Sequence, residues 1–514
     1  MTTHMKKIFL VLTMAGGLMM SSCSDWLEVL PKNEQVTSDY WKSKEDVEAV
    51  LASGYYYMRT TIPYLIDWGE LRGGSVYTPF VGARSKIQDF QLVANSSYCK
   101  WEAFYQVINM ANSVINYAPT VLGVDETYKE ASMKSHQTEA YFMRALTYFY
   151  LVRNFKEVPL VLTPYVDDSA PYVVAKSNEN EILEQIKKDI ETALDTDAAK
   201  ESYDEVWANK GRATKWSLYA LMADVCLWME DYDGCITYAN KLIEANASFR
   251  PVFISSPENW FTVFYPGNSN ESIFELNWDY ATYGQTSNSP SNYYQLQASS
   301  IYLYTTAMKE RLVEETEEVL EGKNPVRSLY GAYVPSTDDY KTAELAYVWK
   351  YQGVGVDDVN AVRANKDANF IIYRMADVLL MKAEALIWKG ADSWEAALKI
   401  INQIRVRANL PELVINLQEA DELTMLKYVL NERDMELAAE GKRWYDLMRL
   451  GKSKNYKYKN EFIQMVIANN KTASQSWLRS VLKNEYAWYL PIFQDELEAN
   501  ELLKQNPYYD VMNQ

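Results

Sequence analysis

The chain has 514 residues, 51 of them Lys or Arg and 69 Asp or Glu, so its formal net charge is -18. This acidic balance argues against a nucleic-acid partner and against docking on anionic lipid through basic residues. The length and the 48% share of hydrophobic residues allow a large core, in one repeat-built body or in two lobes. Forty tyrosines and fifteen tryptophans exceed what helix packing needs and favour an aromatic binding surface.

The N-terminus is typical of a secretion signal. Lys6 and Lys7 precede an apolar segment, residues 8–20, which is too short to span a bilayer. Small residues and then Cys23 follow, as in a bacterial lipoprotein cleavage site, although Met20 stands where leucine is usual. A plain secretory signal with a chance cysteine is the alternative. We predict a lipoprotein signal peptide over residues 1–22 and lipid attachment at Cys23.

The N-terminal half, residues 23–212, begins with an extended segment and then shows the helical period. That period predicts helices over residues 44–58, 101–117, 137–152 and 179–194, and prolines bound a short strand or extended run over residues 155–164. Between residues 62 and 95 the period disappears, while glycine and proline are frequent. We therefore expect a loop region that could line a site, with Trp68, Glu70, Arg72 and Tyr77 in it.

The C-terminal half, residues 213–514, opens with two helices folded back on each other over residues 213–244. Small residues such as Ala223 allow close helix packing, and the length matches a tetratricopeptide unit, which must stack on copies of itself. Residues 374–408 provide a second copy, in which Ala383 and Trp388 correspond to Ala223 and Trp228. The sequence therefore predicts a scaffold of helical repeats, which does not by itself name a function.

Residues 250–370 interrupt the helical pattern and predict an irregular lobe. Within it, residues 271–276 predict a strand, and residues 278–304 are polar and aromatic with a single charge, Asp279. A helix is expected over residues 422–450. It carries Glu432, Arg433, Glu436 and Glu440 on neighbouring turns, and carboxylates so spaced predict a structural ion-pair network more than a catalytic pair.

Cysteine and histidine restrict the possible chemistry. Apart from Cys23 the cysteines are Cys99, Cys226 and Cys235, an odd number without metal-ligand spacing. Cys226 and Cys235 lie on apolar faces of one hairpin, as buried hydrophobic side chains or as a bridge. His136 is the single histidine beyond the signal peptide, so multi-histidine metal sites are excluded and a Ser-His-Asp arrangement would depend on it. We expect no cofactor and no metal.

Seven stretches distributed along the chain resemble the SusD/RagB outer-membrane lipoproteins of Bacteroidetes, in the order typical of that family. One of them is NERDMELAAEGKRWYDLMRLGK; together they cover residues 23–59, 139–161, 211–232, 270–276, 370–386, 431–452 and 490–509. Phe493 stands where a second proline is common and Lys156 where glycine is common. Both departures affect turns more than chemistry.

The resemblance implies a mainly α fold, with tetratricopeptide-like helical repeats packed against the irregular, loop-rich lobe. It also implies a lipid-anchored protein on the extracellular side of the outer membrane. Its partner would be a SusC-like TonB-dependent transporter, to which it would deliver oligosaccharides without hydrolysing them. Family members present their N-terminal loops and the lobe at one binding face.

Three classes of function remain open: a glycan-binding protein, a glycosidase, and an adaptor whose concave surface binds peptides or glycoproteins. Sugars stack their C–H faces on aromatic rings and offer hydroxyls to amides and carboxylates. For a glycan site we predict stacking by Trp278, Tyr280 and Tyr283 with Trp68 and Tyr77 opposite, and hydroxyl contacts by Glu70, Arg72 and Asn292. Which glycan binds does not follow from the sequence.

Overall fold

The computed structural model describes residues 40–166, 172–297, 299–333, 345–355, 361–470 and 472–512. Contacts divide the chain into two units, Met1–Lys42 and Ser43–Gln514, and the second unit contains the helices and strands from α3 to α22. Cys23 and the signal peptide lie outside the described residues. The boundary between residues 212 and 213 stays a prediction. No helix in the described part of the chain has both the length and the apolar character needed to cross a bilayer.

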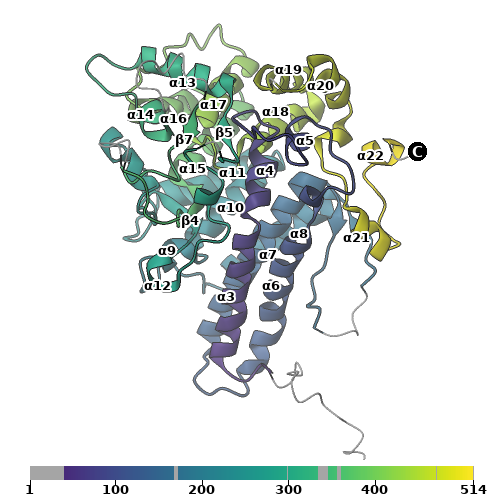
Figure 1. Cartoon of the computed structure of the whole chain (residues 1–514). Helices are drawn as coiled ribbons and strands as arrows, with labels where there is room; N and C mark the ends of the chain where they lie inside the picture. The colour runs from purple at the N-terminus through teal and green to yellow at the C-terminus, as the bar shows by residue number, and fades with distance from the viewer. Residues whose placement is uncertain are drawn as a thin grey trace, which may run out of the picture. The chain divides into compact units, whose positions relative to one another are not determined.

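Long helices that pack in succession form the N-terminal part of this unit (Figure 1). α3 (Lys44–Thr60) packs on α6 (Glu102–Val121), α6 on α7 (Glu130–Phe155), and α7 on α8 (Glu179–Asp195). Reciprocal side-chain bonds start two of them, between Ser43 and Asp46 in α3 and between Asn178 and Glu181 in α8. All four predicted helices are confirmed, and α7 begins earlier than expected.

The predicted loop over residues 62–95 starts with a helix, α4 (Ile62–Glu70), so that part of the prediction is wrong. Pro63 stands in the first turn, where its missing N–H is not needed. Gly69 marks a close approach and not a turn, because a Cβ there would lie 2.2 Å from the carbonyl oxygen of Gly441. The remaining segments are short: β1 (Val76–Tyr77), α5 (Ser85–Gln88) and η2 (Ser97–Cys99).

Strand pairing joins segments that are distant in sequence. β1 pairs with β5 (Leu303–Tyr304), placing Val76 opposite Tyr304, so the N-terminal region and the lobe do meet. β2 (Val158–Pro159) pairs with β3 (Lys176–Ser177). The strand predicted over residues 155–164 is reduced to these two residues, because α7 continues to Phe155.

Two helical hairpins occupy the positions predicted for them. They are α10 (Lys215–Trp228) with α11 (Tyr232–Ile243), and α15 (Met375–Lys389) with α16 (Trp394–Arg407). α11 packs against α15, so the hairpins stack, and Ala223 and Ala383 are both fully buried. Cys226 and Cys235 are buried free thiols and form no bridge. Assignment of these hairpins to the tetratricopeptide class stays a prediction.

The lobe over residues 250–370 is less irregular than predicted. The strand expected over residues 271–276 is confirmed as β4 (Ser272–Leu276), which pairs antiparallel with β8 (Phe370–Arg374). Trp260, Phe261 and Trp349 form a core of their own in the lobe. Its other elements are η3 (Pro257–Val263), α12 (Tyr280–Tyr283), η4 (Pro290–Asn292), α13 (Thr306–Glu318), α14 (Val326–Gly331), β6 (Ala332–Tyr333) and β7 (Tyr347–Val348). The short helix α9 (Ala208–Gly211), which precedes the lobe in the sequence, packs on β4.

The single helix predicted over residues 422–450 is wrong, because the chain forms two helices, α17 (Glu422–Glu436) and α18 (Arg443–Tyr456). Ala439 and Gly441 adopt positive φ angles of 66° and 74° in the turn between them, which ends the first helix. The rest of the C-terminal region consists of η5 (Ala391–Ser393), α19 (Lys459–Asn469), α20 (Gln475–Leu482), η6 (Glu485–Trp488), α21 (Gln494–Ala499) and α22 (Pro507–Met512).

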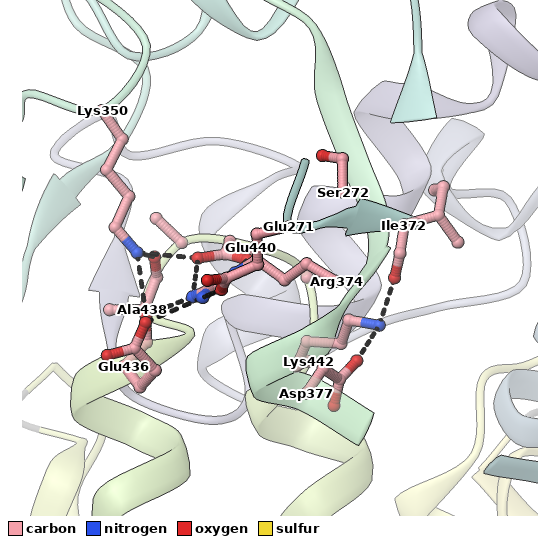
Figure 2. Close-up of polar contacts among 12 residues, drawn as sticks. Glu271, Ser272, Lys350, Ile372, Arg374, Asp377, Glu436, Ala438, Glu440 and Lys442 are labelled. Atoms are coloured by element: carbon pink, nitrogen blue, oxygen red, sulfur yellow. Dashed lines mark hydrogen bonds and ion pairs between the residues drawn. The ribbon is translucent and has the colours of Figure 1, made fainter. Parts of the chain in front are cut away.

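A buried ion-pair network joins β4, β8, α16 and α17. Figure 2 shows Arg374 among the carboxylates of Glu271, Glu436 and Glu440, at 2.9, 2.8 and 2.9 Å. Arg407 contacts Glu271 and Glu436 as well, at 2.5 and 2.7 Å. The predicted structural role of Glu436 and Glu440 is confirmed. Lys442 and Arg443, which follow these carboxylates in the sequence, pair with Asp377 and Asp434 instead.

Candidate ligand-binding site

One face of α3 forms a wall of a pocket of about 610 Å³, which we call the aromatic pocket. The α3 residues that line the pocket recur every three or four positions, so their side chains project from one side of the helix. The pocket is completed by residues from the segments around α9, β4 and α12. The lining residues are Glu48, Leu51, Ala52, Tyr55, Tyr56, Arg59, Trp207, Gly211, Arg212, Asn268, Leu276, Asn277, Trp278, Asp279, Tyr280, Ala281, Tyr283, Gln285 and Asp367.

Exposed aromatic rings surround this pocket. Of the nine strongly exposed aromatic side chains that the structure describes, four line it: Tyr56 is 56% exposed, Trp207 51%, Tyr280 44% and Tyr283 71%. When a ligand contacts an exposed ring, the apolar surface of the ring is removed from water, which favours binding. Exposed rings gathered around one concavity therefore indicate a binding site. Trp278 is different, because its ring is buried and its Nε1 donates to the Ser287 carbonyl at 2.8 Å.

The four-residue helix α12 positions two of these rings. The Asp279 side chain accepts a hydrogen bond from the Thr282 backbone N–H at 2.8 Å, which caps the helix at its start. Gly284 ends it in the left-handed conformation, at φ 63°. Hydrogen bonds to Thr282 hold the pKa of Asp279 below its usual value, so this carboxylate stays ionised and does not suit a general acid.

The side chain of Arg59 extends from α3 toward the wall formed around α12. Its Nη1 donates to the Asn277 carbonyl at 3.2 Å and to Gln285 Oε1 at 2.6 Å. Its guanidinium lies 5.7 Å from the centre of the Tyr56 ring and 5.8 Å from that of Trp278. Gln285 Oε1 also accepts the Asp279 N–H at 3.2 Å, so Arg59 and Gln285 hold the two walls together.

The base of the pocket is a buried set of polar contacts. Tyr55 donates from its hydroxyl to Glu139 at 2.7 Å, and Arg212 binds the same carboxylate at 2.6 Å. Burial, with the negative charge of Glu139, raises the pKa of Tyr55 well above its usual value, so the hydroxyl remains a donor. These bonds hold Tyr55 and Arg212 in place on one side of the pocket.

A second, more polar pocket of about 640 Å³ adjoins the first and shares Glu48 and Arg212 with it. His136 lines this polar pocket and contacts Tyr128, with 3.0 Å between its Nδ1 and the hydroxyl. Burial lowers the pKa of His136 to about 4, so the imidazole is neutral at physiological pH. Among the described residues, no three His, Cys, Asp or Glu side chains group in a way that could hold a metal ion.

The fold places the residues of the sequence-predicted site in different parts of the molecule. Trp278, Tyr280 and Tyr283 line the aromatic pocket, as expected of one wall. Trp68, Glu70 and Arg72, expected at the ligand, are buried elsewhere, so the prediction of exposed side chains is wrong for all three. They lie on or just after α4, whose packing against the core was not visible from the glycine- and proline-rich sequence.

Each of these three side chains has structural partners. The Trp68 ring stacks on Phe104, with 4.9 Å between ring centres, and its Nε1 donates to the Tyr98 carbonyl. Arg72 donates to the Trp488 carbonyl at 2.6 Å and lies over the Trp444 ring. Glu70 accepts the backbone N–H groups of Gly441 and Lys442, at 2.7 and 3.1 Å. These bonds fasten α4 to the C-terminal region.

Tyr77 and Asn292 are not part of the aromatic pocket. Tyr77 lines a separate cavity of about 210 Å³, together with Thr305, Asn469 and other residues. Asn292 donates its side-chain amide to the carbonyls of Thr286 and Ser289, at 2.6 and 3.2 Å, and so stabilises its own loop.

Sequence reasoning missed the α3 face, above all Tyr56 and Arg59, and also Trp207 and Gln285. The predicted site residues lie in stretches without helical period, whereas Tyr56 and Arg59 belong to a regular helix. A signal was available, since an amphipathic helix carries its apolar residues on one side, and Tyr56 falls outside the buried positions of α3. An aromatic residue on the polar side of a helix is a candidate for binding.

Two family models together match most of the chain. The family model described as "SusD family" matches residues 187–509, and one described as "Starch-binding associating with outer membrane" matches residues 25–227. SusD-like protein P38 of Formosa agariphila is 29% identical over 504 residues, covering 87% of this chain and 91% of the relative. A SusD-like protein of Bacteroides ovatus is 25% identical, covering 87% of this chain and 83% of the relative.

Solved structures agree in fold. A SusD superfamily protein from Bacteroides thetaiotaomicron superposes with a TM-score of 0.71 at 21% identity, covering 91% of this chain and 99% of its own. A laminarin binding SusD-like protein superposes with a TM-score of 0.67 at 21% identity, covering 91% and 100%. These likenesses show the predicted mainly helical fold. The SusD family model matches residues 187–509, which is more than half of the chain, so the chain belongs to the SusD family.

Proposed function

We propose that this protein binds oligosaccharides in the aromatic pocket, without hydrolysing them, and delivers them to a SusC-like TonB-dependent transporter. The observation that carries the proposal is the gathering of four exposed rings, Tyr56, Trp207, Tyr280 and Tyr283, around one cavity. Sugar rings present C–H faces that stack on such aromatic surfaces. The laminarin-binding SusD-like protein of the same fold supports a carbohydrate ligand.

The lining of the pocket includes polar groups of the kind that sugar hydroxyls need. Asn268 and Gln285 carry amides and Arg59 a cation, in the same pocket as the four rings. Each ring is already held by the backbone of a helix or of a short segment next to one, so little ordering is needed on binding. The pocket volume of about 610 Å³ is larger than a single sugar needs and accommodates a short oligosaccharide segment.

The test is alanine substitution of Tyr56, Trp207, Tyr280 and Tyr283 one at a time, with glycan affinity measured by calorimetry against a glycan panel. A ring that stacks on a sugar should contribute about 1 kcal/mol or more, so its loss weakens binding roughly fivefold or more. Phe249→Ala is the control, because Phe249 is 64% exposed and does not line the pocket. Normal affinity in all four pocket variants, with unchanged melting temperatures, would remove the site.

Non-catalytic binding is supported by the ionised state of Asp279 and the neutral state of buried His136. Sugar release from a polysaccharide incubated with the purified protein would contradict it and revive the glycosidase alternative. Peptides and glycoproteins in the same panel test the third class. A peptide ligand that competes for the pocket while no glycan binds would replace the proposed ligand.

Delivery requires the protein to lie on the cell surface beside its transporter. We propose that Cys23 carries the lipid that anchors it to the outer membrane, facing outward, where the SusC-like partner is. Gentle detergent extraction should co-purify a TonB-dependent transporter. Cys23→Ala should release the protein from membranes of a strain that lacks this transporter, and retention there would disprove lipid attachment at Cys23.

A further inference from the structure

Arg59 is a cation without a carboxylate partner among the described residues, in a protein with 69 acidic side chains. The other guanidinium of the aromatic pocket differs, since Arg212 is paired with Glu139 at 2.6 Å. Two of the carboxylates that line the pocket have cations elsewhere: Glu48 pairs with Lys44 at 3.2 Å and Asp367 with Arg363 at 3.6 Å. The third, Asp279, is engaged by the Thr282 N–H.

No carboxylate of the described residues contributes to the pKa shift of Arg59. Burial lowers the pKa of its guanidinium, and the opposing contribution comes from Tyr56. By contrast, carboxylates raise the pKa of Arg84 and Arg212 despite their burial. Removing a cation partly from water without a compensating anion is unfavourable, so the free protein holds an unsatisfied positive charge in this pocket.

The geometry leaves one edge of the guanidinium available. Its five N–H donors are fixed in a plane, and Nη1 is used by Asn277 and Gln285. Nε and Nη2 have no partner among the described residues, and neither is sealed from solvent. This edge presents two parallel donors, the arrangement that binds a carboxylate or a sulfate through two hydrogen bonds.

We propose that the aromatic pocket selects anionic sugars, with the Nε–Nη2 edge of Arg59 binding a carboxylate or sulfate group while neighbouring rings stack on the sugar. This inference rests on the proposed glycan binding and names the ligand class. The rings of Tyr56 and Trp278 lie against the guanidinium, and Gln285 fixes its Nη1, so the cation is oriented before the ligand arrives.

The test compares ligands that differ in charge alone. Oligogalacturonate is measured against its fully methyl-esterified form, and a sulfated carrageenan oligosaccharide against its desulfated form, by calorimetry at constant ionic strength. The wild-type protein should bind at least one charged form about tenfold or more tighter than its neutral partner. The pair that shows the difference identifies the anionic group as a uronic acid or a sulfate ester.

Three variants assign the preference to Arg59. Arg59→Gln should remove the preference for the charged form. Because Arg59 also joins the two pocket walls, both affinities should fall, and the charged form should lose about tenfold or more beyond the loss of the neutral form. Arg59→Lys should restore part of it, because an ammonium supplies charge without the paired donors. Lys200→Gln is the matched control, since Lys200 lines the adjoining polar pocket and its loss changes the net charge equally.

Two results would overturn the inference. Equal binding of charged and neutral forms by the wild-type protein would exclude charge selection, as would an equal loss of both forms in a stably folded Arg59→Gln variant. Either result leaves ring-dependent binding of neutral glycans intact, so the proposed function would survive. The proposed function fails separately, if neither charged nor neutral glycans bind or if the ring variants bind normally.

Discussion

Glu70 illustrates at the residue scale how the fold changes the meaning of a charged side chain. Its Oε1 accepts two backbone N–H groups, whereas its Oε2 is buried without a hydrogen-bond partner in the described part of the chain. Burial raises the pKa of Glu70 to about 8, and the nearby charge of Asp434 contributes. The carboxyl group is therefore protonated in the folded protein at neutral pH.

This protonation predicts a pH dependence for Glu70. The folded pKa of about 8 lies above the unfolded value near 4.5, so stability is present below the unfolded pKa and is lost as pH rises from about 4.5 to 8. In Glu70→Gln this loss should be absent, because the amide keeps the acceptor and cannot ionise. Denaturant unfolding of both proteins at several pH values measures this loss. As the pH rises, the unfolding free energy of the wild-type protein should fall relative to that of Glu70→Gln.

A control for this residue comes from Glu485, an acidic side chain near the surface that pairs with Lys459. Glu485→Gln should follow the wild-type pH profile above pH 5, since its pKa lies below the usual value. If Glu70→Gln and the wild-type protein show parallel profiles between pH 5 and 8, Glu70 is ionised in the folded state and the burial argument fails.

At the element scale, α12 shows how a very short helix can build a binding wall. Four residues are too few for a helix to be stable alone, so the cap at Asp279 and the left-handed Gly284 determine where Tyr280 and Tyr283 lie. Arg59 and Gln285 then join this wall to α3. Both elements are needed for one pocket, although they lie far apart in the sequence.

Loss of the α12 cap should weaken ligand binding without unfolding the protein. In Asp279→Ala the Thr282 N–H loses its acceptor, so we expect glycan affinity to fall about threefold or more, with the melting temperature nearly unchanged. Asp279→Asn retains a capping oxygen and should bind almost normally. Equal losses in the two variants would mean that the Asp279 charge contacts the ligand and that capping is not the cause.

The hairpin of α10 and α11 belongs to the core and should be intolerant of charge. Ala223 is fully buried where α10 packs, so Ala223→Arg would place an unpaired cation among apolar side chains. The cost should be about 3 kcal/mol or more. Thr237→Arg is the control, because Thr237 is exposed on α11 of the same hairpin. Unfolding free energies that fall equally in both variants would contradict this assignment of the buried face.

At the scale of the whole molecule, the ion-pair network links the lobe to the C-terminal helices. Glu271 precedes β4, Arg374 ends β8, Arg407 ends α16 and Glu436 ends α17, so one cluster connects four elements. Figure 2 shows Glu271, Arg374 and Glu436 of this cluster. Burial alone would raise the pKa of Glu436, but Arg407, Arg374 and Arg327 outweigh it and lower the pKa to about 2. Protonation of such a carboxylate removes several bonds at once.

Acid should therefore unfold the protein through this network. The folded pKa of Glu436 lies below its unfolded value near 4.5, so its stabilising effect is present above pH 4.5 and is lost as pH falls toward 2. Glu436→Gln should be strongly destabilised at pH 7, because Arg374 and Arg407 lose a shared anion, and its stability should depend less on pH below 4.5. Thermal unfolding from pH 3 to 7 measures both effects. A wild-type-like acid profile would exclude Glu436 as the origin.

The sequence alone determined those features that depend on neighbours within a few turns. Apolar spacing located the helices over residues 44–58 and 179–194 and both hairpins, because the period of a helix is a local property. The apolar run at residues 271–276 located β4. Spaced motifs identified the family resemblance, and the polar, aromatic stretch after β4 contained three side chains of the pocket, Trp278, Tyr280 and Tyr283.

The tertiary structure decided which side chains are covered and which distant segments meet. The sequence suggested site roles for Trp68, Glu70 and Arg72, yet in the fold all three are buried on or just after α4. Their partners include the backbone of Gly441 and Trp488, far away in the sequence. Glu436 finds Arg374 and Arg407 through packing of β8 and α16, which no local pattern encodes. Tyr56 and Arg59 became candidates for binding only because α3 and α12 line one pocket, since burial and concavity arise from the arrangement of whole elements.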